Sequence, residues 1–282
     1  MDTQANPLEP SSRAASPMVE LRQVEVVFDR VPVLRDINLV IPRGQTLVII
    51  GESGCGKTVL LKTIIGLLRP TRGQALFDGK NLAHLTEAEL THERIRFGFV
   101  FQGSALFDSM TIGQNVGFPL REHRRSSPAQ LHEAVVSRLA EVGLPESIID
   151  KKPAELSGGM RKRVGLARAM ALSPELILYD EPTTGLDPIM SDVINELILR
   201  TRSQHSVTSV VVTHDMRTAR KVGDRVIMLY PTSRLEPDEP QIVFDGASGS
   251  IDQSSDPRVT QFVHGEAGER LMEMRRTAET GG

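Results

Sequence analysis

Residues 51–58 read Gly51-Glu52-Ser53-Gly54-Cys55-Gly56-Lys57-Thr58, and they follow the apolar run Thr46–Ile50. A continuous apolar run is typical of a parallel strand that is buried on both faces. Residues 58–68 then carry apolar side chains at helical spacing and stop before Pro70. A glycine-rich loop between a buried strand and a helix matches the phosphate-binding loop of nucleotide-hydrolysing proteins. The stretch therefore predicts both a nucleotide site and an α/β fold.

The residue types of this loop explain its chemistry. Its glycines allow backbone N–H groups to turn toward phosphate oxygens, and the following helix N-terminus adds a partial positive charge. Lys57 is expected to face the β and γ phosphates as a point charge, and the Thr58 hydroxyl is expected to ligate Mg²⁺. The residues predicted to contact ATP here are Gly51, Ser53, Gly54, Cys55, Gly56, Lys57 and Thr58.

A second feature lies far downstream, where the apolar run Leu176–Tyr179 ends in Asp180 and Glu181. An aspartate at a strand end can hold Mg²⁺, and the adjacent glutamate can orient and deprotonate an attacking water molecule. Such a pair is often only the start of a solvated loop. Because a phosphate loop precedes it in an α/β chain, we predict a metal ligand at Asp180 and a catalytic base at Glu181.

The third feature is Leu156-Ser157-Gly158-Gly159-Met160, which leads into the basic helix 161–172. Ser157, Gly158 and Gly159 at a helix start can form a second anion site. The alternative is an ordinary helix cap by Ser157, and an isolated segment would favour it. The combination with the two features above favours the anion site.

The remaining patterns extend the same fold. We predict further strands at 24–28, 34–41, 207–212 and 226–229. Turns are predicted at 29–32 and, in a hairpin, at 78–79, and a helix is predicted at 128–142. Strands that alternate with helices indicate a P-loop NTPase core of the α/β class with a mostly parallel sheet. We also expect an N-terminal antiparallel β region and an inserted helical subdomain at about 104–165.

The chain is predicted to have one main domain, residues 18–247. Residues 1–17 are rich in Pro, Ser and Ala and are predicted to be a disordered lead-in rather than a secretory signal. The polar C-terminal tail, 248–282, has apolar clusters only at 259–263 and 271–274. No apolar run approaches the roughly 18 residues of a membrane helix, so a membrane role would require a partner.

Composition excludes several classes of function. The net charge of −3, the 4% of aromatic residues and the absence of tryptophan argue against a nucleic-acid surface. Cys55 is the single cysteine, so an intrachain disulfide is excluded, as is typical of a reducing compartment.

The three features together resemble the ATP-binding subunits of ABC transporters over residues 19–247. The resemblance implies that Gln102 in a glutamine loop touches Mg²⁺ and that His214 contacts the γ-phosphate. It also implies that Gly185-Leu186-Asp187 crosses a dimer interface and that Phe28 stacks on adenine. Taken singly, His214 and Phe28 could be ordinary core side chains.

The resemblance further implies a homodimer. ABC proteins place their two anion sites too far apart within one chain to share one ATP. Two chains arranged head to tail would bring Ser157 and Gly159 of one chain onto the γ-phosphate held by Lys57 of the other, and a two-fold axis makes two identical sites.

Within the family, the segments 101–110, 115–123 and 256–262 are similar to those of Mla-type ATPases, although Met160 replaces the usual glutamine. This resemblance implies phospholipid transport between two membranes, an integral membrane permease, an Mce-domain protein and a location on the cytoplasmic face of the inner membrane. In this family the region 104–110 forms part of the groove that receives a permease helix, and Leu106 and Phe107 are its expected apolar contacts. The alternative is that Leu106 and Phe107 belong to the core of the helical subdomain. The alternatives are ATPases for uptake of small, amino-acid-like solutes or for lipoprotein release.

Overall fold

A computed structural model describes residues 17–123 and 127–267. The predicted lead-in, except for residue 17, and the apolar cluster at 271–274 lie outside these residues. The described strands form two sheets, one of four strands and one of six. Within 17–123 and 127–267, no helix combines the length and the apolar character needed to cross a membrane.

The six-stranded main sheet carries the phosphate loop. Its strands are β3 (Thr46–Gly51), β6 (Phe97–Val100), β7 (Leu176–Asp180), β8 (Thr208–Val212), β9 (Arg225–Leu229) and β10 (Ile242–Ala247). They lie in the order β10-β9-β3-β8-β7-β6, and all neighbours are parallel except the antiparallel pair β9 and β10. Every residue of β3, β7 and β8 is buried, as the apolar runs predicted.

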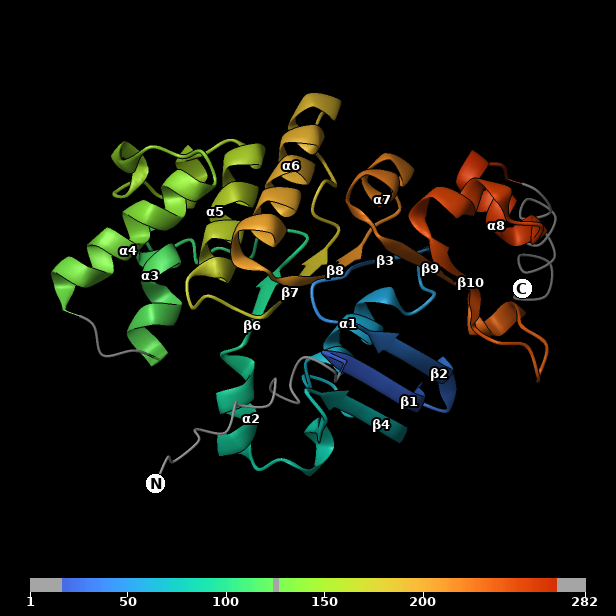
Figure 1. The fold of residues 1–282 in the computed structure, drawn as a ribbon. Helices are drawn as coiled ribbons and strands as arrows, with labels where there is room; N and C mark the ends of the chain where they lie inside the picture. Colours follow the sequence, from blue (N-terminus) through green and yellow to red (C-terminus); the bar gives the residue numbers. More distant parts are fainter. Residues whose placement is uncertain (1–16, 124–126, 268–282) are drawn as a thin grey trace, which may run out of the picture.

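Alternate residues of β3 supply two separate cores. Val48 and Ile50 belong to the core shared with the helices on one face of the sheet, whereas Leu47 and Ile49 belong to the core on the other face. The helices of the first face are α5 (Gly158–Met170), α6 (Pro188–His205) and α7 (Met216–Val222). The other face packs on α1 (Lys57–Ile64) and on the smaller sheet, so the molecule has three layers (Figure 1).

The smaller sheet is the expected N-terminal antiparallel region. It contains β1 (Val19–Phe28), β2 (Val31–Ile41), β4 (Arg72–Phe77) and β5 (Lys80–Asn81) in the order β2-β1-β4-β5. Asp78 and Gly79 join β4 to β5 with φ angles of 52° and 76°, which confirms the predicted hairpin turn. A short 3-10 turn, η2 (Leu82–His84), and α2 (Glu87–Arg94) then lead to β6.

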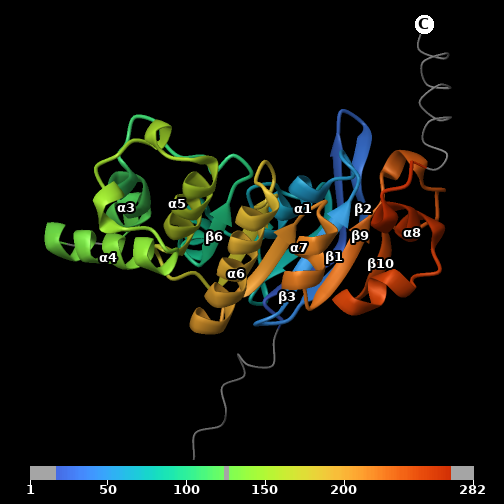
Figure 2. The same ribbon diagram turned by 90° about the horizontal axis from the view of Figure 1, so that it is seen from above.

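A group of helices lies at the β6 end of the main sheet (Figure 2). It contains α3 (Ile112–His123), α4 (Pro128–Glu141), the 3-10 turns η3 (Glu146–Ile148) and η4 (Pro153–Glu155), and the start of α5. Buried residues of these helices, including Val116 and Leu139, join the same core as the helix face of the sheet. The described residues of this region form helices, turns and loops without a strand, in keeping with the inserted helical subdomain that the sequence predicts.

The chain beyond residue 247 packs on the main domain. After β10 come η6 (Ser248–Gln253) and α8 (Pro257–His264). Ile251 and Val259 are fully buried in the core that also contains Val226 and Met228 of β9. The first part of the segment predicted as a polar tail is thus an ordered extension of the domain.

Candidate functional site

The phosphate loop has the backbone geometry that its glycines allow. It leaves β3 at Gly51 and enters α1 at Lys57. Gly56, with φ of 99°, is in the left-handed region, and a Cβ there would lie 3.0 Å from the Val33 carbonyl oxygen. Only glycine accepts both the conformation and the contact without strain. The loop therefore lies tightly against the small sheet.

Lys57 lies folded over the loop. Its ammonium donates to the carbonyl oxygens of Gly51 and Glu52, each at 2.8 Å. This position holds a positive charge where the loop backbone and the α1 N-terminus also favour an anion. A cavity of about 560 Å³ opens here. It is lined by Val33, Gly51, Ser53, Gly54, Gly56, Lys57, Thr58, Val59, Gln102, Asp180, Glu181, Val212 and His214.

Two oxygen ligands converge at one end of this cavity. The Thr58 hydroxyl lies 3.3 and 3.4 Å from the two carboxylate oxygens of Asp180, which is buried at the end of β7. Burial raises the pKa of the Asp180 carboxyl. A cation at this point would favour the ionised form, and hard oxygen ligands in this arrangement suit Mg²⁺.

Glu181 is the next residue and has an unusual backbone. Its φ of 49° is in the left-handed region, which is unfavourable for a residue with a side chain. Its carboxylate accepts a hydrogen bond from the Thr184 hydroxyl at 3.0 Å and lies 2.8 Å from Nδ1 of His214. The carboxylate, largely shielded from solvent, thus faces the cavity beside an exposed imidazole. This pair can accept a proton from water at the phosphate end.

Comparisons with known proteins agree with this geometry. Residues 34–184, more than half of the chain, match the ABC transporter family. The chain belongs to the ABC transporter family.

Relatives of this ABC ATPase include two named transport proteins. The intermembrane phospholipid transport system ATP-binding protein MlaF of Escherichia coli is 39% identical over 89% of this chain and 90% of its own length. The probable ribonucleotide transport ATP-binding protein mkl of Mycobacterium tuberculosis is 40% identical over 88% of this chain, but the chain spans only 66% of that relative. Among solved structures, the dimeric post-hydrolysis cassette MJ0796 with ADP and Pi has a TM-score of 0.73, with 32% identity over 82% of this chain and 99% of that one.

The ABC ATPase brings Gln102 to the same cavity from the end of β6. The backbone carbonyl oxygen of Gln102 accepts a hydrogen bond at 2.7 Å from the Lys162 ammonium. The same ammonium donates to the backbone carbonyl oxygen of Glu181 at 3.1 Å. Lys162 is buried, and burial lowers the pKa of its ammonium. Lys162 is not among the site residues predicted from the sequence. Its position four residues before buried Leu166 of α5 was the available signal, because that spacing places both on one helix face.

The predicted second anion site, at the start of α5, lies away from the cavity at Lys57. The Ser157 hydroxyl accepts a hydrogen bond from the Met160 N–H at 3.3 Å, so it caps α5. Ser157, Gly158 and Gly159 are not among the residues that line the cavity at Lys57. The chain therefore does not bring its two predicted anion sites together.

The other predicted residues have varied surroundings. Phe28 is exposed at the end of β1, outside the lining of the cavity. Cys55 is buried below the loop, and burial raises the pKa of its thiol, so it is a packing residue rather than a reactive one. Asp187 caps α6 by accepting the N–H groups of Ile189 and Met190, each at 3.0 Å.

Proposed function

We propose that this chain is the ATPase of a phospholipid transporter and acts as a homodimer on the cytoplasmic face of the inner membrane. An integral membrane permease and an Mce-domain protein would complete the complex, and phospholipid would be its cargo. The observation that supports phospholipid as the cargo is the 39% identity to MlaF over about nine tenths of both chains. Such coverage leaves little of either chain without a counterpart.

The binding step follows from the cavity. The N–H groups of residues 51–58 and the Lys57 ammonium would hold the β and γ phosphates of ATP. Thr58 and Asp180, with Gln102 at the same cavity, are the residues that would hold Mg²⁺. When bound, Mg²⁺ neutralises phosphate charge that develops during transfer.

The hydrolytic step would use Glu181 and His214. The Glu181 carboxylate would accept the proton of the attacking water, and its hydrogen bond from Thr184 fixes its orientation. His214, exposed at the mouth of the cavity, would contact the γ-phosphate. In the structure, Nδ1 of this imidazole lies 2.8 Å from the Glu181 carboxylate.

A second copy would complete each site. The exposed start of α5 offers Ser157 and Gly158 to solvent, away from the Lys57 cavity of the same chain. A head-to-tail partner can present this helix start to the γ-phosphate. The dimeric arrangement of the MJ0796 cassette supports this proposal.

An apolar groove suits the permease. A cavity of about 410 Å³ lies between β6, α3 and α5, and its rim includes exposed Phe101 and Phe107 beside Phe118. Leu106 was expected to take part as well. It instead packs partly buried against the hydrophobic core and is not among the residues that line the groove, which agrees with the alternative for this residue.

The matched variants Phe107→Glu and Leu106→Glu test the groove. Phe107→Glu should reduce co-purification with the permease by tenfold or more, on the order of an aromatic hot spot. Its melting temperature should stay the same, because Phe107 is 43% exposed. Leu106→Glu should lower the melting temperature. Normal permease association of a folded Phe107→Glu protein would reject the groove as the docking site.

The cargo has its own experiment. The chain, purified with its permease and placed in liposomes, should change its ATPase rate with phospholipid and Mce-domain partner. Two comparison experiments use soluble solutes instead of lipid. Nucleotides are tested because of the name of the mycobacterial relative. Amino acids with a binding protein are tested because of the solute-uptake alternative. Stimulation by a soluble solute alone would overturn the lipid proposal and leave the ATPase assignment intact.

A further inference from the structure

The connection between β9 and β10 is much longer than its topology requires. The two strands are antiparallel neighbours, which a two-residue loop can join. Here the chain instead runs through residues 230–241 and includes the 3-10 turn η5 (Thr232–Arg234). This segment, called the β9–β10 connection below, lies against the phosphate loop and the start of β2.

Gln241 is the buried end of this connection. The residue is only 1% exposed. Its side-chain amide nitrogen donates to the backbone carbonyl oxygens of Val33 and Cys55, each at 3.0 Å. Its amide oxygen accepts the backbone N–H of Arg35 at 2.8 Å. Among neutral side chains, only a primary amide offers two donors and an acceptor in this form. The bonds join β2 directly to the phosphate loop.

The bond to Cys55 fixes the orientation of a peptide unit in the nucleotide site. The described peptide bonds are all trans, and a trans peptide directs its C=O and N–H in opposite directions. With the Cys55 carbonyl held by Gln241, the N–H of Gly56 points away from Gln241. That N–H belongs to the set that cradles phosphate. Gly56 itself has no side chain to restrain it, so an outside contact is an effective restraint.

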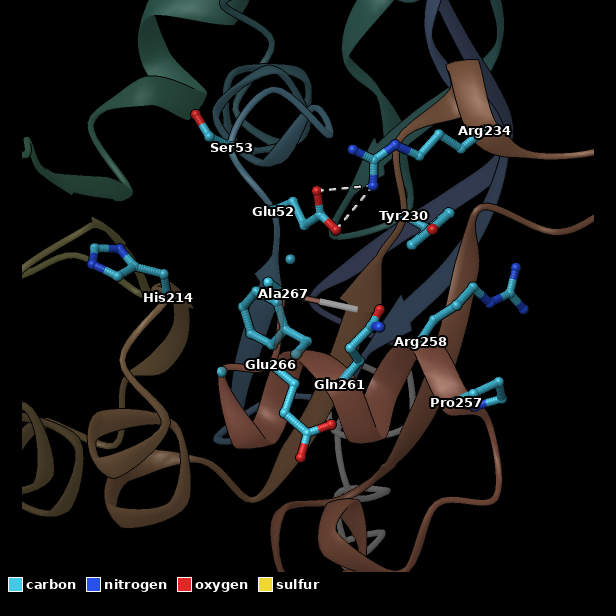
Figure 3. Close-up of a pocket in the computed structure, with 13 residues that line it drawn as sticks. Glu52, Ser53, His214, Tyr230, Arg234, Pro257, Arg258, Gln261, Glu266 and Ala267 are labelled. Carbon is cyan, nitrogen blue, oxygen red and sulfur yellow. Dashed lines mark hydrogen bonds and ion pairs between the residues drawn. The ribbon is translucent and has the colours of Figure 1, made fainter. Parts of the chain in front are cut away.

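A second contact holds the opposite end of the loop. Arg234 donates to both carboxylate oxygens of Glu52 at 3.1 Å, as the dashed lines in Figure 3 show. Behind Arg234, the Tyr230 ring lies 5.1 Å from the guanidinium of Arg258 in α8. The helix after the main sheet therefore supports the same connection.

The connection is also tied to β2 along its length. The Thr232 hydroxyl donates to the Pro32 carbonyl at 2.6 Å. The Arg35 guanidinium donates to the carbonyl oxygens of Glu236 and Glu239 at 2.7 and 2.6 Å. These bonds leave the connection little freedom to move independently of the small sheet.

We propose that the β9–β10 connection pre-organises the phosphate loop and that Gln241 is a positioning residue for ATP binding. This proposal rests on the proposed role of residues 51–58 as the nucleotide site. Gln241 is not itself among the residues that line the cavity, and its side-chain hydrogen bonds go to backbone groups of Val33, Arg35 and Cys55. None of these bonds reaches Asp180, Glu181 or His214. Its loss should therefore weaken nucleotide binding and leave the chemical step intact.

The test uses full-length Gln241→Leu and titration with Mg²⁺-ATP. The dissociation constant and KM for ATP should rise on the order of tenfold, as expected when buried carbonyl oxygens lose their donors. At saturating ATP, kcat should stay within about twofold of wild type, the split expected of a binding effect. Asn115→Leu, which removes another buried amide far along the helical region, should lower the melting temperature without changing ATP affinity.

A second variant keeps the proposal testable if Gln241→Leu does not fold. Gln241→Glu preserves shape and the bond from the Arg35 N–H, but an ionised carboxylate cannot donate to either carbonyl oxygen. Because burial raises the pKa of a glutamate, its ATP affinity relative to wild type should fall between about pH 6 and about pH 9.

The outcomes separate the two proposals. Equal ATP affinity of wild type and folded Gln241→Leu, equal losses in kcat and affinity, or a pH-independent affinity ratio for Gln241→Glu would overturn the positioning role alone. Failure of wild type itself to bind ATP would overturn the nucleotide site and the positioning role with it.

Discussion

Replacing Glu181 with glutamine tests the hydrolytic site most directly. The substitution keeps the size of the side chain and one oxygen that can accept the Thr184 hydroxyl at 3.0 Å. The same carboxylate oxygen, Oε2, lies 2.8 Å from Nδ1 of His214, so an amide oxygen in its place can also accept from the tautomer that carries its proton on Nδ1. Lys57 and the loop backbone make no described contact with the Glu181 carboxylate, so ATP binding should persist.

The expected loss is in the chemical step. An amide cannot accept a proton from water, and a positioned general base contributes about 10²–10⁴-fold. This corresponds to about 3–5 kcal/mol in activation free energy. Phosphate release at saturating Mg²⁺-ATP should slow by that factor, while the ATP dissociation constant should change by less than about threefold. ATP should then trap a dimer, which light scattering can detect.

Thr184→Val provides the matched control. It removes the hydroxyl that orients the carboxylate but retains the base, so hydrolysis should slow by less than about tenfold, on the order of one hydrogen bond. A Glu181→Gln protein with turnover near that of wild type would refute the assignment of Glu181 as the base. A rate loss equal to that of Thr184→Val would also refute it.

Three further changes have distinct expected results. Lys57→Ala should abolish tight ATP binding in calorimetry, because it removes the cation at the loop, and unchanged affinity would exclude a phosphate loop. Ser157→Arg should leave ATP binding by the single chain intact but prevent ATP-induced dimers in light scattering; normal dimers would reject the composite site. Arg96→Met should destabilise the fold by about 1.5–3 kcal/mol at neutral pH, because buried Glu93 loses one of its two cationic partners among the described residues and keeps only Lys80. Burial raises the pKa of Glu93, but hydrogen bonds from Lys80 and Arg96 outweigh this effect and lower the pKa overall. A carboxyl with a lowered pKa in the folded state stabilises the fold only while it is ionised. In urea-unfolding experiments, this stabilisation should therefore be lost as the pH falls below about 4.

The sequence predicts the part of the fold that apolar runs and special backbone conformations specify. Residues 46–50 and 176–179 are continuous apolar runs, and both form strands of the main sheet that are buried on both faces. Asp78-Gly79 predicts its turn because both residues tolerate positive φ. The cavity residues come from short motifs whose order in the chain carries the information, and the structure brings most of them to the cavity.

Boundaries fail where a local feature competes with periodicity. The helix predicted at 58–68 ends at Ile64, because Gly66 adopts a φ of 65° and its N–H bonds the Thr63 carbonyl. The turn predicted at 29–32 closes two residues earlier, because Pro32 fits within β2, an edge strand with no ladder bond to lose on its free side. Pro as a turn signal was therefore misleading here.

Other features depend on contacts that a linear pattern does not contain. β6 is a four-residue strand with a central glycine, too short to show alternation, and it forms because β7 lies beside it. Lys162 and Gln241 have buried polar groups whose partners are backbone carbonyl oxygens distant in sequence. A carbonyl is present at every position, so no sequence pattern identifies the one that is used.

The α5 helix has a consequence for how two copies would work together. Ser157 caps its N-terminus, and Lys162, about 7 Å further along the axis, donates hydrogen bonds to the backbone carbonyl oxygens of Gln102 and Glu181. A helix of this length moves as a rigid rod, so a push on its first turn by ATP bound to the other copy would shift the backbone of the proposed base in its own copy. The two proposed hydrolysis sites of a dimer would then be coupled, because ATP bound at one site would change the position of the proposed base at the other.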